Sequence, residues 1–396
     1  QRLNLNTSIT QRTLTLEDLI SIVKEIIRLN EDFEAVGDDI DHLGNRRVKA
    51  VGESLLDRFR VGLMRMRRTI QDRMASLDSR TLTPAQLINP RQLTGALKEF
   101  FNVSQLCQFM DQVNMLSELE HKRKITPIGP GGITPERAGI EVRDIHPSHY
   151  SRICPIQTPE GKNIGLVLNL ALYTRLNELG FLEAPYFKVK DCRLTPEIIW
   201  LDAFEELKHK IAHYGVELDE TGRIKKDWVE ARVLGEPTLV RREDIDLMDI
   251  SNQQIISAAV ALVPFLEHDE SNRVLMGANM ERQAVPCVRP DPPLVSTGLE
   301  EKIAQNSGQC IISSEEGVVE KVDGREIIIA TKNGEKKKYE LTLFERSNKN
   351  TCLLQRPTVN KGDKIKVGDI LADGSNSRDG VLALGQNLLV AFIPFY

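Results

Sequence analysis

The chain of 396 residues has no long apolar run, few aromatic side chains and no closely paired cysteines. No run approaches the ~20 apolar residues that a membrane-spanning helix needs. The six cysteines are scattered without a CxxC pair, which argues against a zinc ribbon and suits a reducing compartment. The first residues, Gln-Arg-Leu-Asn-Leu-Asn, lack the apolar core of a signal peptide. From these absences we expect a cytoplasmic protein without a membrane partner, with a plastid-type organelle as the open alternative.

Several common catalytic signatures are also missing. The chain has no nucleophile elbow, Walker loop or dinucleotide fingerprint. His146 and His149 have some metal-ligand character, but Pro147 breaks the helical geometry that would align the two rings. A stand-alone metal hydrolase is therefore a poor interpretation, and a hydrogen-bonded structural role fits the pair better. The acidic run 38–41 is expected to form a cap or loop beside the arginines at 46–47 rather than a magnesium site.

Length and charge narrow the class of protein. A chain of this length is expected to form two to four domains rather than one core. The net charge of −5 argues against a general nucleic-acid coat protein. The local balance differs, because residues 121–163 carry seven Lys/Arg against four Asp/Glu, whereas 195–250 carry eight against fourteen. This distribution fits a protein that meets nucleic acid at one internal surface beside an acidic module.

Apolar periodicity predicts helices in the first hundred residues. Thr15 and Asp18 form a capping-box pattern before a helix over about 16–27, and a longer helix is predicted over 49–75. A third helix is predicted from Pro90 to Phe101, with helical character continuing over 105–112. The long helix also carries arginines that fit either a solvated face, the plainer interpretation, or a surface turned toward DNA: Arg58, Arg60, Arg65, Arg67, Arg68 and Arg73.

The sequence after residue 124 predicts loops, strands and short helices in separate segments. Prolines and glycines over 124–162 predict ordered loop and short strand, and a stretch of this length is usually functional. A separate acidic module follows, with a strand at 186–189 and a helix over about 196–214, and another helix-containing segment begins at 253. After Cys310 the period changes to two, which predicts a β-barrel or sandwich. Its expected elements are strands at 317–322, 326–330 and 338–341, a hairpin turn at Asn333-Gly334, and further turns and strands over 359–374. The predicted fold class is multi-domain α+β.

Two polar clusters have the character of nucleotide-binding sites. Gln105, Gln108 and Asp111 are spaced to share one helix face ahead of the basic run 121–124 and the glycine turn 129–132. Amides and cations on adjoining surfaces suit an RNA backbone, although a basic tetrapeptide alone is usually a solvated face. The second cluster joins an arginine block to two amides: Arg273, Asn279, Arg282 and Gln283. Ion pairs with the neighbouring acids are its alternative, namely Glu267, Asp269, Glu270 or Glu281.

The stretch 105–165 closely resembles the bacterial DNA-directed RNA polymerase beta subunit. The resemblance continues through 265–269, 272–273, 276–280 and 282–286, and more weakly from 38–47 to 382–387. It therefore covers nearly the whole chain in the family's order. It implies a nucleotidyltransferase that copies template DNA into RNA within a multisubunit complex. A non-catalytic nucleic-acid-binding or assembly protein that keeps this module is the competing hypothesis.

The resemblance also implies domains and site residues. It divides the chain into a helical end of the lobe and protrusion (1–82), an RNA channel with fork loop (83–165), an external acidic module (166–250) and the start of a hybrid-binding domain (251–396). The fork loop would include Gly129, Pro130, Gly131, Gly132 and Arg137. The RNA or hybrid would meet Gln105, Gln108, His121, Lys124, Glu160, Asn163, Asn279, Arg282 and Gln283. A rifamycin pocket would comprise Leu106, Cys107, Gln108, Phe109, Asp111, His121, Lys124, Thr126, Ile128, Pro159, Asn163 and Val167.

By the same resemblance, Arg273 would face the triphosphate of the incoming nucleotide, where a planar, permanently charged fork binds phosphate. Magnesium would be required by the whole enzyme but held by the other large subunit, so no metal site is expected here. The implied partners are the beta-prime, alpha and omega subunits, a sigma factor, template DNA, nascent RNA and ribonucleoside triphosphates.

The chain departs from the family's usual pattern at several positions. Lys124 stands where arginine is usual, and Thr126 and Cys107 stand where serine is usual. Losing a guanidinium fork and adding a methyl group in the implied rifamycin pocket predict reduced rifamycin sensitivity. Met115 replaces a proline, and Pro135 replaces an arginine of the fork loop. We also expect the chain to be a central part of a longer subunit that neither polymerises RNA alone nor holds the metal.

Overall fold

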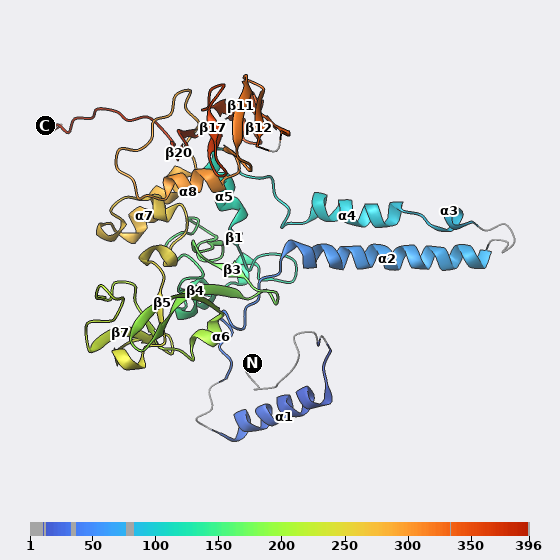
Figure 1. The fold of residues 1–396 in the computed structure, drawn as a ribbon. Helices are drawn as coiled ribbons and strands as arrows, with labels where there is room; N and C mark the ends of the chain where they lie inside the picture. The colour runs from blue at the N-terminus through green and yellow to red at the C-terminus, as the bar shows by residue number, and fades with distance from the viewer. Residues whose placement is uncertain (1–10, 12, 33–36, 77–82, 333, 395–396) are drawn as a thin grey trace. The chain divides into compact units, whose positions relative to one another are not determined.

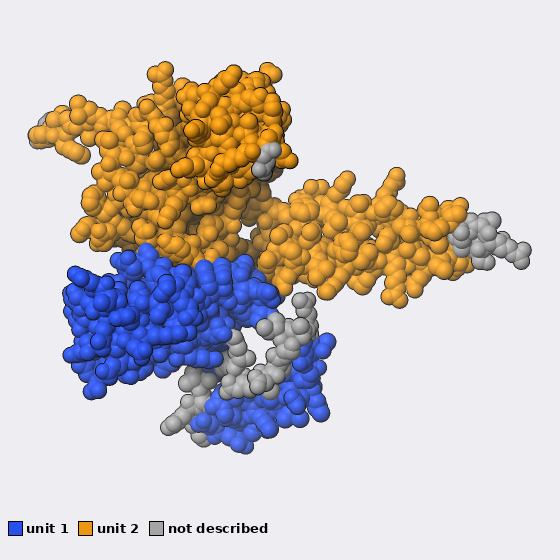
Figure 2. Space-filling view, in the orientation of Figure 1, with its two compact units in different colours: residues 1–48, 146–149, 175–252 blue, residues 49–145, 150–174, 253–396 orange. Residues whose placement is uncertain are grey.

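A computed structural model of the chain describes residues 11, 13–32, 37–76, 83–332 and 334–394 (Figure 1). It divides into two compact units, which are described separately (Figure 2). Unit 1 comprises residues 1–48, 146–149 and 175–252, and unit 2 comprises 49–145, 150–174 and 253–396. Helices and several separate sheets occur together, so the predicted multi-domain α+β class is confirmed.

Unit 1 contains helix α1 (Leu16–Glu31), which confirms the predicted helix and extends it by one turn. The capping box is present, because the Asp18 amide donates to Thr15 Oγ1 at 3.3 Å and the Thr15 amide donates to Asp18 Oδ2 at 2.8 Å. These bonds satisfy amides that the first turn of a helix otherwise leaves without partners. No residue of α1 is buried, so the helix is fixed locally by its cap rather than by a core.

A seven-stranded sheet forms the body of unit 1. Its order is β3-β4-β9-β6-β7-β8, and β5 also pairs with β4. The strands are β3 (Arg175–Leu176), β4 (Leu182–Lys190), β5 (Arg193–Leu201), β6 (Ile211–Ala212), β7 (Trp228–Val233), β8 (Glu236–Arg241) and β9 (Leu247–Asp249). The predicted strand at 186–189 is confirmed within β4, where Tyr186 is fully buried. Unit 1 also contains helix α6 (Ala203–Glu206) and the 3₁₀ helices η3 (Pro147–His149) and η4 (Arg242–Asp244).

The predicted helix over 196–214 is wrong. Most of its first part is β5, antiparallel to β4, and only the short α6 is helical. The register shifts between Phe187 and Val189, which leaves Pro196 in a bulge where no ladder amide is required. Thr195 Oγ1 closes the bulge by donating to the carbonyl oxygen of Lys188 at 2.7 Å. The proline therefore marks an irregular strand and not a helix start.

Two long helices form an arm of unit 2. Helices α2 (Val51–Ser76) and α4 (Arg91–Val103) confirm two predictions, and α3 (Pro84–Leu87) lies between them in sequence. Figure 1 shows α4 alongside α2, and Gly62 permits this approach because a Cβ there would lie 3.0 Å from Leu93 Cδ1 and 3.2 Å from Ala96 Cβ. Gln92 Nε2 donates to Thr69 Oγ1 at 2.7 Å. All arginines of α2 except Arg73 are exposed, which both interpretations of that face allow.

The prediction that helical character continues over 105–112 is wrong. Helix α4 ends at Val103, and residues 104–114 form turns and extended backbone before α5 (Met115–Lys122). Asn114 starts α5 by accepting the Ser117 amide at 2.8 Å, so the next helix begins only after the expected continuation. Gln105, Gln108 and Asp111 consequently do not share a helix face.

Residues 124–162 form the predicted ordered loop with one short strand. Strand β1 (Lys124–Ile125) pairs with β2 (Leu168–Asn169). The 3₁₀ helices are η1 (Pro135–Arg137), η2 (Glu141–Arg143) and η3 (Pro147–His149). Further along the chain lie η5 (Asn252–Ile255), η6 (Val260–Leu262), η7 (Leu266–His268), α7 (Ser271–Glu281) and α8 (Glu300–Asn306). Helix α7 confirms the predicted helical segment after 253.

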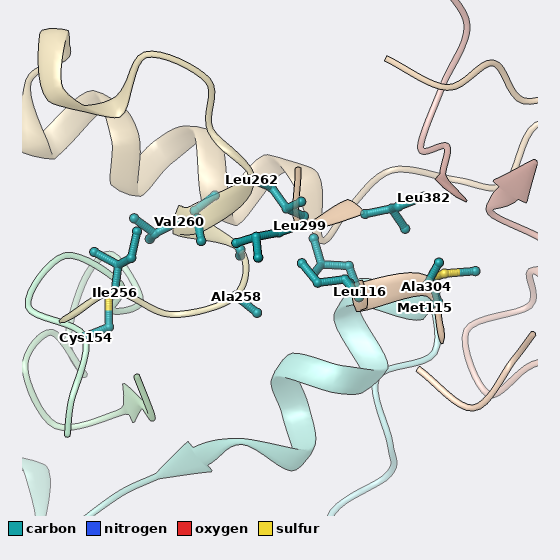
Figure 3. Close-up of a cluster of buried hydrophobic side chains, with 14 of the residues drawn as sticks. Met115, Leu116, Cys154, Ile256, Ala258, Val260, Leu262, Leu299, Ala304 and Leu382 are labelled. Carbon is teal, nitrogen blue, oxygen red and sulfur yellow. The ribbon is translucent and has the colours of Figure 1, made fainter. Parts of the chain in front are cut away.

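The main core of unit 2 is drawn in Figure 3, where Met115 and Leu116 reach from α5 toward Leu299 and Ala304. Both α5 side chains are 0% exposed. Burying a side chain of this size contributes about 1.5–3 kcal/mol, so α5 is anchored by its apolar face while its ends remain available for polar contacts. Ile256, Val260 and Leu382 extend the same cluster.

The C-terminal region is built from small antiparallel sheets. One has the order β13-β12-β11-β17 and another β10-β18-β16, while β14-β15 and β19-β20 form separate pairs. The bounds are β10 (Ile311–Ile312), β11 (Gly317–Val322), β12 (Glu326–Thr331), β13 (Lys336–Glu340), β14 (Glu345–Arg346), β15 (Cys352–Leu353), β16 (Arg356–Pro357), β17 (Lys364–Ile365), β18 (Ile370–Asp373), β19 (Ser377–Arg378) and β20 (Val381–Leu382). The strands predicted after residue 310 are confirmed. Gly334 has the positive φ of the predicted turn, and Asn333 lies outside the described residues.

Candidate functional site

His121, near the end of α5, organises the first polar cluster of unit 2. Its Nδ1 accepts a hydrogen bond from the Asp111 amide at 3.0 Å, and its Nε2 lies 3.2 Å from Gln108 Oε1. An accepting Nδ1 leaves the neutral ring with its proton on Nε2, which then donates to Gln108. Burial, followed by the charge of Lys124, lowers the pKa of His121. The structure thus joins Gln108, Asp111 and His121 through the imidazole rather than through a shared helix face.

Lys124 and Arg282 bring positive charge to this cluster. Burial and the charge of Arg282 lower the pKa of Lys124, and both cations contribute to lowering the pKa of His121. Neither side chain forms an ion pair among the described residues, although the charges of Asp111 and Glu120 partly offset that of Arg282 at Lys124. Cations that repel one another at a partly buried surface are stabilised by an added anion. This arrangement has the electrostatic character of a phosphate site.

Helix α7 carries the second predicted cluster. Asn279 Oδ1 accepts from Arg282 Nη2 at 2.5 Å, and Asn279 Nδ2 donates to the carbonyl oxygen of Thr158 at 3.5 Å. Gln283 follows and is exposed. Arg273 lies in the first turn, nine residues before Arg282, or roughly 13 Å along the helix axis at 1.5 Å per residue. The structure therefore joins Asn279 with Arg282 and separates Arg273 from them.

Arg273 is exposed, and the part of the chain that the structure describes forms no ion pair with it or with Arg282. Two of the acids predicted as alternative ion-pair partners, Glu267 and Asp269, contact other groups instead. Asp269 Oδ1 accepts from the Glu270 amide at 2.8 Å, and Glu267 lies 3.9 Å from His268. The Arg273 guanidinium is thus open to a ligand, whereas that of Arg282 is partly buried and donates to Asn279.

Two carboxyl groups near Arg282 are shielded from water: Glu120 is buried and Glu281 is half-buried. Glu120 is 0% exposed, and burial raises its pKa although its Oε1 accepts the Ala259 amide at 2.9 Å. Burial, together with the charges of Glu120 and Glu300, raises the pKa of Glu281 to about 8. A carboxyl group with that pKa is mostly protonated at neutral pH, so Glu281 does not neutralise the adjacent Arg282.

In the glycine turn 129–132, Gly132 is required by close backbone packing, whereas Gly131 faces open space. The Gly132 amide donates to the Gly129 carbonyl at 2.9 Å, and a Cβ on Gly132 would lie 2.1 Å from the Pro127 oxygen. Gly132 is therefore required by the turn itself. Gly131 has φ +79° with nothing within 4 Å of an added Cβ, so its backbone faces open space. Pro130 is exposed at the tip of the turn, and Arg137 ends η1 with an exposed side chain.

The residues of the predicted rifamycin pocket are close in sequence but differ in exposure. Phe109 is 88% exposed and Leu106 is 46% exposed, whereas Cys107 is only partly exposed. Thr126 Oγ1 donates to the Leu166 carbonyl at 2.8 Å, which ties β1 to the loop 158–167. On that loop Glu160 and Asn163 are exposed. The remaining predicted positions are half-buried, namely Ile128, Pro159 and Val167, and Gln105 is exposed.

The histidine pair in unit 1 has a hydrogen-bonded structural role. His146 lies 2.7 Å from Ser148 Oγ through Nδ1 and 2.7 Å from Asp39 Oδ2 through Nε2. His149 is buried, and burial lowers its pKa to about 4, with the charges of His146 and Arg46 adding to the shift. Asp41 lies 3.5 Å from Arg46, as the loop interpretation of the acidic run expects. The described residues contain no group of three or more His, Cys, Asp or Glu that could hold a metal.

The sequence analysis missed two supporting residues. Asn114 caps α5 and also donates from Nδ2 to the carbonyl oxygens of Glu281 and Ala284, each at 2.9 Å. Its cap pattern, Asn followed by Ser117 and Glu118, was readable from the sequence. Lys349 approaches His121 closely enough to lower the pKa of His121. No local pattern indicates Lys349, because its segment meets residues 110–112 only through long-range hydrogen bonds.

Four domain models of the same protein type match the chain in order. They are "RNA polymerase Rpb2, domain 2" over residues 1–49, "RNA polymerase Rpb2, domain 3" over 108–176, "RNA polymerase beta subunit external 1 domain" over 186–251 and "RNA polymerase Rpb2, domain 6" over 312–396. The arrangement is thus that of a large subunit of a multisubunit RNA polymerase.

Whole-chain comparisons specify the family. The chain is 50% identical over 400 residues to proteins named DNA-directed RNA polymerase subunit beta from Caulobacter vibrioides, Caulobacter sp. (strain K31) and Brucella canis. Each alignment covers 100% of this chain and 29% of the relative. The chain belongs to the bacterial RNA polymerase beta subunit family and spans less than a third of the length of these relatives. No helix among the described residues is long and apolar enough to cross a membrane.

Proposed function

We propose that the protein acts in DNA-directed RNA synthesis, copying template DNA by nucleotidyl transfer from ribonucleoside triphosphates. This segment would line the path of the RNA–DNA hybrid and nascent RNA, form the fork loop and supply part of the phosphate site for the incoming nucleotide. The observation that carries the proposal is the pair of cations, Lys124 and Arg282, beside His121. They repel each other, the charges of Asp111 and Glu120 offset this only in part, and neither cation forms an ion pair among the described residues. An RNA phosphate satisfies that cluster, and the amides of Gln108 and Asn279 lie within the same polar surface.

The phosphate roles follow from side-chain chemistry. Arg273 presents an exposed, permanently charged fork that can bind the oxygens of a triphosphate and stabilise negative charge as pyrophosphate leaves. Arg282, oriented by Asn279, contacts the 3′ region of the RNA, with Gln283 beside it. The lowered pKa leaves His121 neutral near pH 7, and both of its ring nitrogens are bonded within the protein, so it acts on RNA by orienting Gln108 rather than by charge.

We propose that the whole enzyme requires magnesium, which would neutralise phosphate charge during nucleotidyl transfer. The resemblance to the family supports assigning that metal to the other large subunit. The proposed partners are the beta-prime, alpha and omega subunits, a sigma factor, template DNA and nascent RNA, and the proposed location is the bacterial cytoplasm at the nucleoid. The proposed domain limits remain 1–82, 83–165, 166–250 and 251–396.

The test uses polymerase assembled with the full-length subunit that contains this segment. RNA carrying a photoreactive base at its 3′ end should cross-link within 105–124 or 279–283, and Lys124→Ala should reduce RNA retention. Removing one phosphate contact should lower the salt dependence of binding by about one unit of slope. Lys361→Ala, at an exposed turn of the C-terminal sheets, is the matched control and should change neither quantity. Assembly without template-dependent synthesis would instead favour the non-catalytic binding alternative.

A further inference from the structure

Arg143 connects two loops that carry proposed site residues. Its Nη1 donates to the carbonyl oxygens of Lys162 at 3.0 Å and Ile164 at 2.8 Å, and its Nη2 donates to that of Pro135 at 3.2 Å. Pro135 belongs to the segment that follows the glycine turn, whereas Lys162 and Ile164 belong to the 158–167 loop. One planar guanidinium therefore bridges the main chains of both loops.

The backbone geometry around Arg143 is equally specific. Gly165 has φ +73°, and a Cβ on it would lie 2.5 Å from the Arg143 carbonyl oxygen and 2.8 Å from Arg143 Cα. Only glycine allows the 158–167 loop to approach the Arg143 backbone this closely. The Gly165 amide donates to Thr158 Oγ1 at 2.9 Å, which fixes the loop in this conformation.

A side-chain ion pair lies across the same two segments. Lys162 Nζ is 2.7 Å from Glu136 Oε1, with side-chain exposures of 69% and 65%. An exposed pair of this kind contributes little stability, because water and salt screen it. The three charge-assisted bonds from Arg143 to carbonyl oxygens are the stronger connection. We use the term Arg143 clasp for Arg143 together with its three carbonyl partners and Gly165.

The 158–167 loop also contacts the helix that carries Arg282. Asn279 Nδ2 donates to the Thr158 carbonyl, and Asn279 Oδ1 accepts from Arg282. Thr126 Oγ1 donates to the Leu166 carbonyl and so joins the loop to β1, which carries Lys124. A continuous set of contacts therefore runs from the glycine-turn segment through the Arg143 clasp to the 158–167 loop. From that loop it continues to β1, which carries Lys124, and to Asn279 and Arg282.

We propose that Arg143 is a positioning residue that couples the fork-loop segment 129–137 to the 158–167 loop, and through that loop to the RNA-side residues. Arg143 itself touches no substrate; it fixes the relative geometry of two loops that do. This inference rests on the proposed function for the meaning of the two loops. The coupling itself is a property of the chain that can be measured without catalysis.

The experiment is hydrogen–deuterium exchange on assembled polymerase containing the full-length subunit, with Arg143→Ala compared with wild type. The informative amides are those of Gly132, Ile133 and Arg137 on one side and those of Ile164, Gly165 and Leu166 on the other. Loss of the clasp should raise exchange in both segments together by about tenfold, because both lose the same guanidinium. A structural role confined to one loop would raise exchange on one side only.

Three variants separate coupling from general damage. Arg143→Lys keeps the charge but lacks the fork that reaches three carbonyls, so it should restore only part of the protection. Gly165→Ala leaves Arg143 intact and should reproduce the two-sided loss, since the added Cβ meets the Arg143 backbone. Arg325→Lys, an exposed arginine of the β11–β12 turn, is the matched control. Protection of β4 and β5 should stay unchanged in every variant.

Exchange that rises in one segment alone, or in neither, overturns the coupling whether or not the enzyme is active. Nucleotide incorporation by the same preparations tests the proposed function separately. A wild-type assembly that fails to incorporate nucleotides while Arg143→Ala still loosens both segments would refute the function and keep the coupling. If the wild-type enzyme is active but Arg143→Ala raises exchange in only one of the two segments, the coupling is refuted and the proposed function is kept.

Discussion

Asn114 Nδ2 donates hydrogen bonds to two main-chain oxygens at the end of α7, those of Glu281 and Ala284, each at 2.9 Å. The same residue starts α5, because its Oδ1 accepts the Ser117 amide at 2.8 Å. One buried amide thus holds the start of the helix that carries His121 against the end of the helix that precedes Arg282. The relative placement of His121 and Arg282, both proposed to face RNA, therefore depends on the hydrogen bonds of Asn114.

We predict that Asn114→Ala destabilises this region by roughly 2–4 kcal/mol, since a lost cap costs about 1 kcal/mol and each of the two part-buried hydrogen bonds to a carbonyl contributes about 0.5–1.5 kcal/mol. Asn114→Asp is the discriminating variant. Aspartate caps helices as well as asparagine does, but it cannot donate to Glu281 and Ala284. It should therefore be at least as harmful as alanine when local stability is measured by hydrogen exchange of α5 and α7. A near-neutral Asn114→Asp would show that only the cap matters.

The raised pKa of Glu281 predicts that the local free energy of unfolding around α7 falls as the pH rises toward 8. Burial, with Glu120 and Glu300, raises its pKa to about 8 in the folded chain from 4.5. The folded state therefore binds the extra proton, so the contribution is fully present below pH 4.5 and is lost as pH rises to about 8. At about 1.4 kcal/mol per pKa unit, the shift from 4.5 to about 8 corresponds to a loss on the order of 5 kcal/mol at most.

Glu281→Gln tests this prediction because glutamine resembles the protonated acid. Protection of α7 in the variant should match wild type at pH 5 and exceed it at pH 9. Wild type and variant should be compared at the same pH, so that intrinsic exchange rates cancel. Equal protection at both pH values would mean that Glu281 is ionised in the folded chain.

His149 in unit 1 predicts the opposite dependence. Burial first, then the charges of His146 and Arg46, lowers its pKa from 6.5 to about 4. The unfolded chain binds the proton first, so the contribution is present above pH 6.5 and is lost as pH falls through 4. His149→Gln should lessen the acid-induced loss of protection over 146–149, measured against wild type at pH 4.5. An unchanged loss in the variant would assign the acid sensitivity to other groups.

The proposed rifamycin pocket predicts an effect of two reversions. Lys124→Arg restores a fork of five donors, and Thr126→Ser removes a methyl group while retaining the hydroxyl that donates to the Leu166 carbonyl. The double variant should be inhibited by rifamycin at about tenfold lower concentration, as one regained charge-assisted hydrogen bond implies. Lys361→Arg is a control remote in sequence. Identical inhibition curves for the double variant and wild type would contradict the hypothesis.

The sequence predicted the helices and strands better than it predicted the long-range contacts that position the candidate site. Local patterns sufficed for α1 with its Thr15 cap and for the alternating strands β11 and β12. They failed over 105–112, because an apolar and amide-rich stretch resembles a helix until Asn114 starts a new one. They also failed at Pro196, where pairing with β4 decides the conformation. The contacts of Arg143 and Lys349 depend on segments distant in sequence, so no local pattern could predict them.

The most direct test of the central claim is the nucleotide dependence of RNA synthesis by polymerase assembled with Arg273→Ala or Arg273→Lys. Arg325→Ala, an exposed arginine outside the proposed site, serves as the matched control. If Arg273 binds the incoming triphosphate, alanine should reduce kcat/KM by about ten- to a hundredfold, the value of one charge-assisted phosphate contact, and lysine should restore part of it. Arg325→Ala should match wild type. Wild-type kinetics in Arg273→Ala would contradict the assignment of this segment to the nucleotide phosphate site.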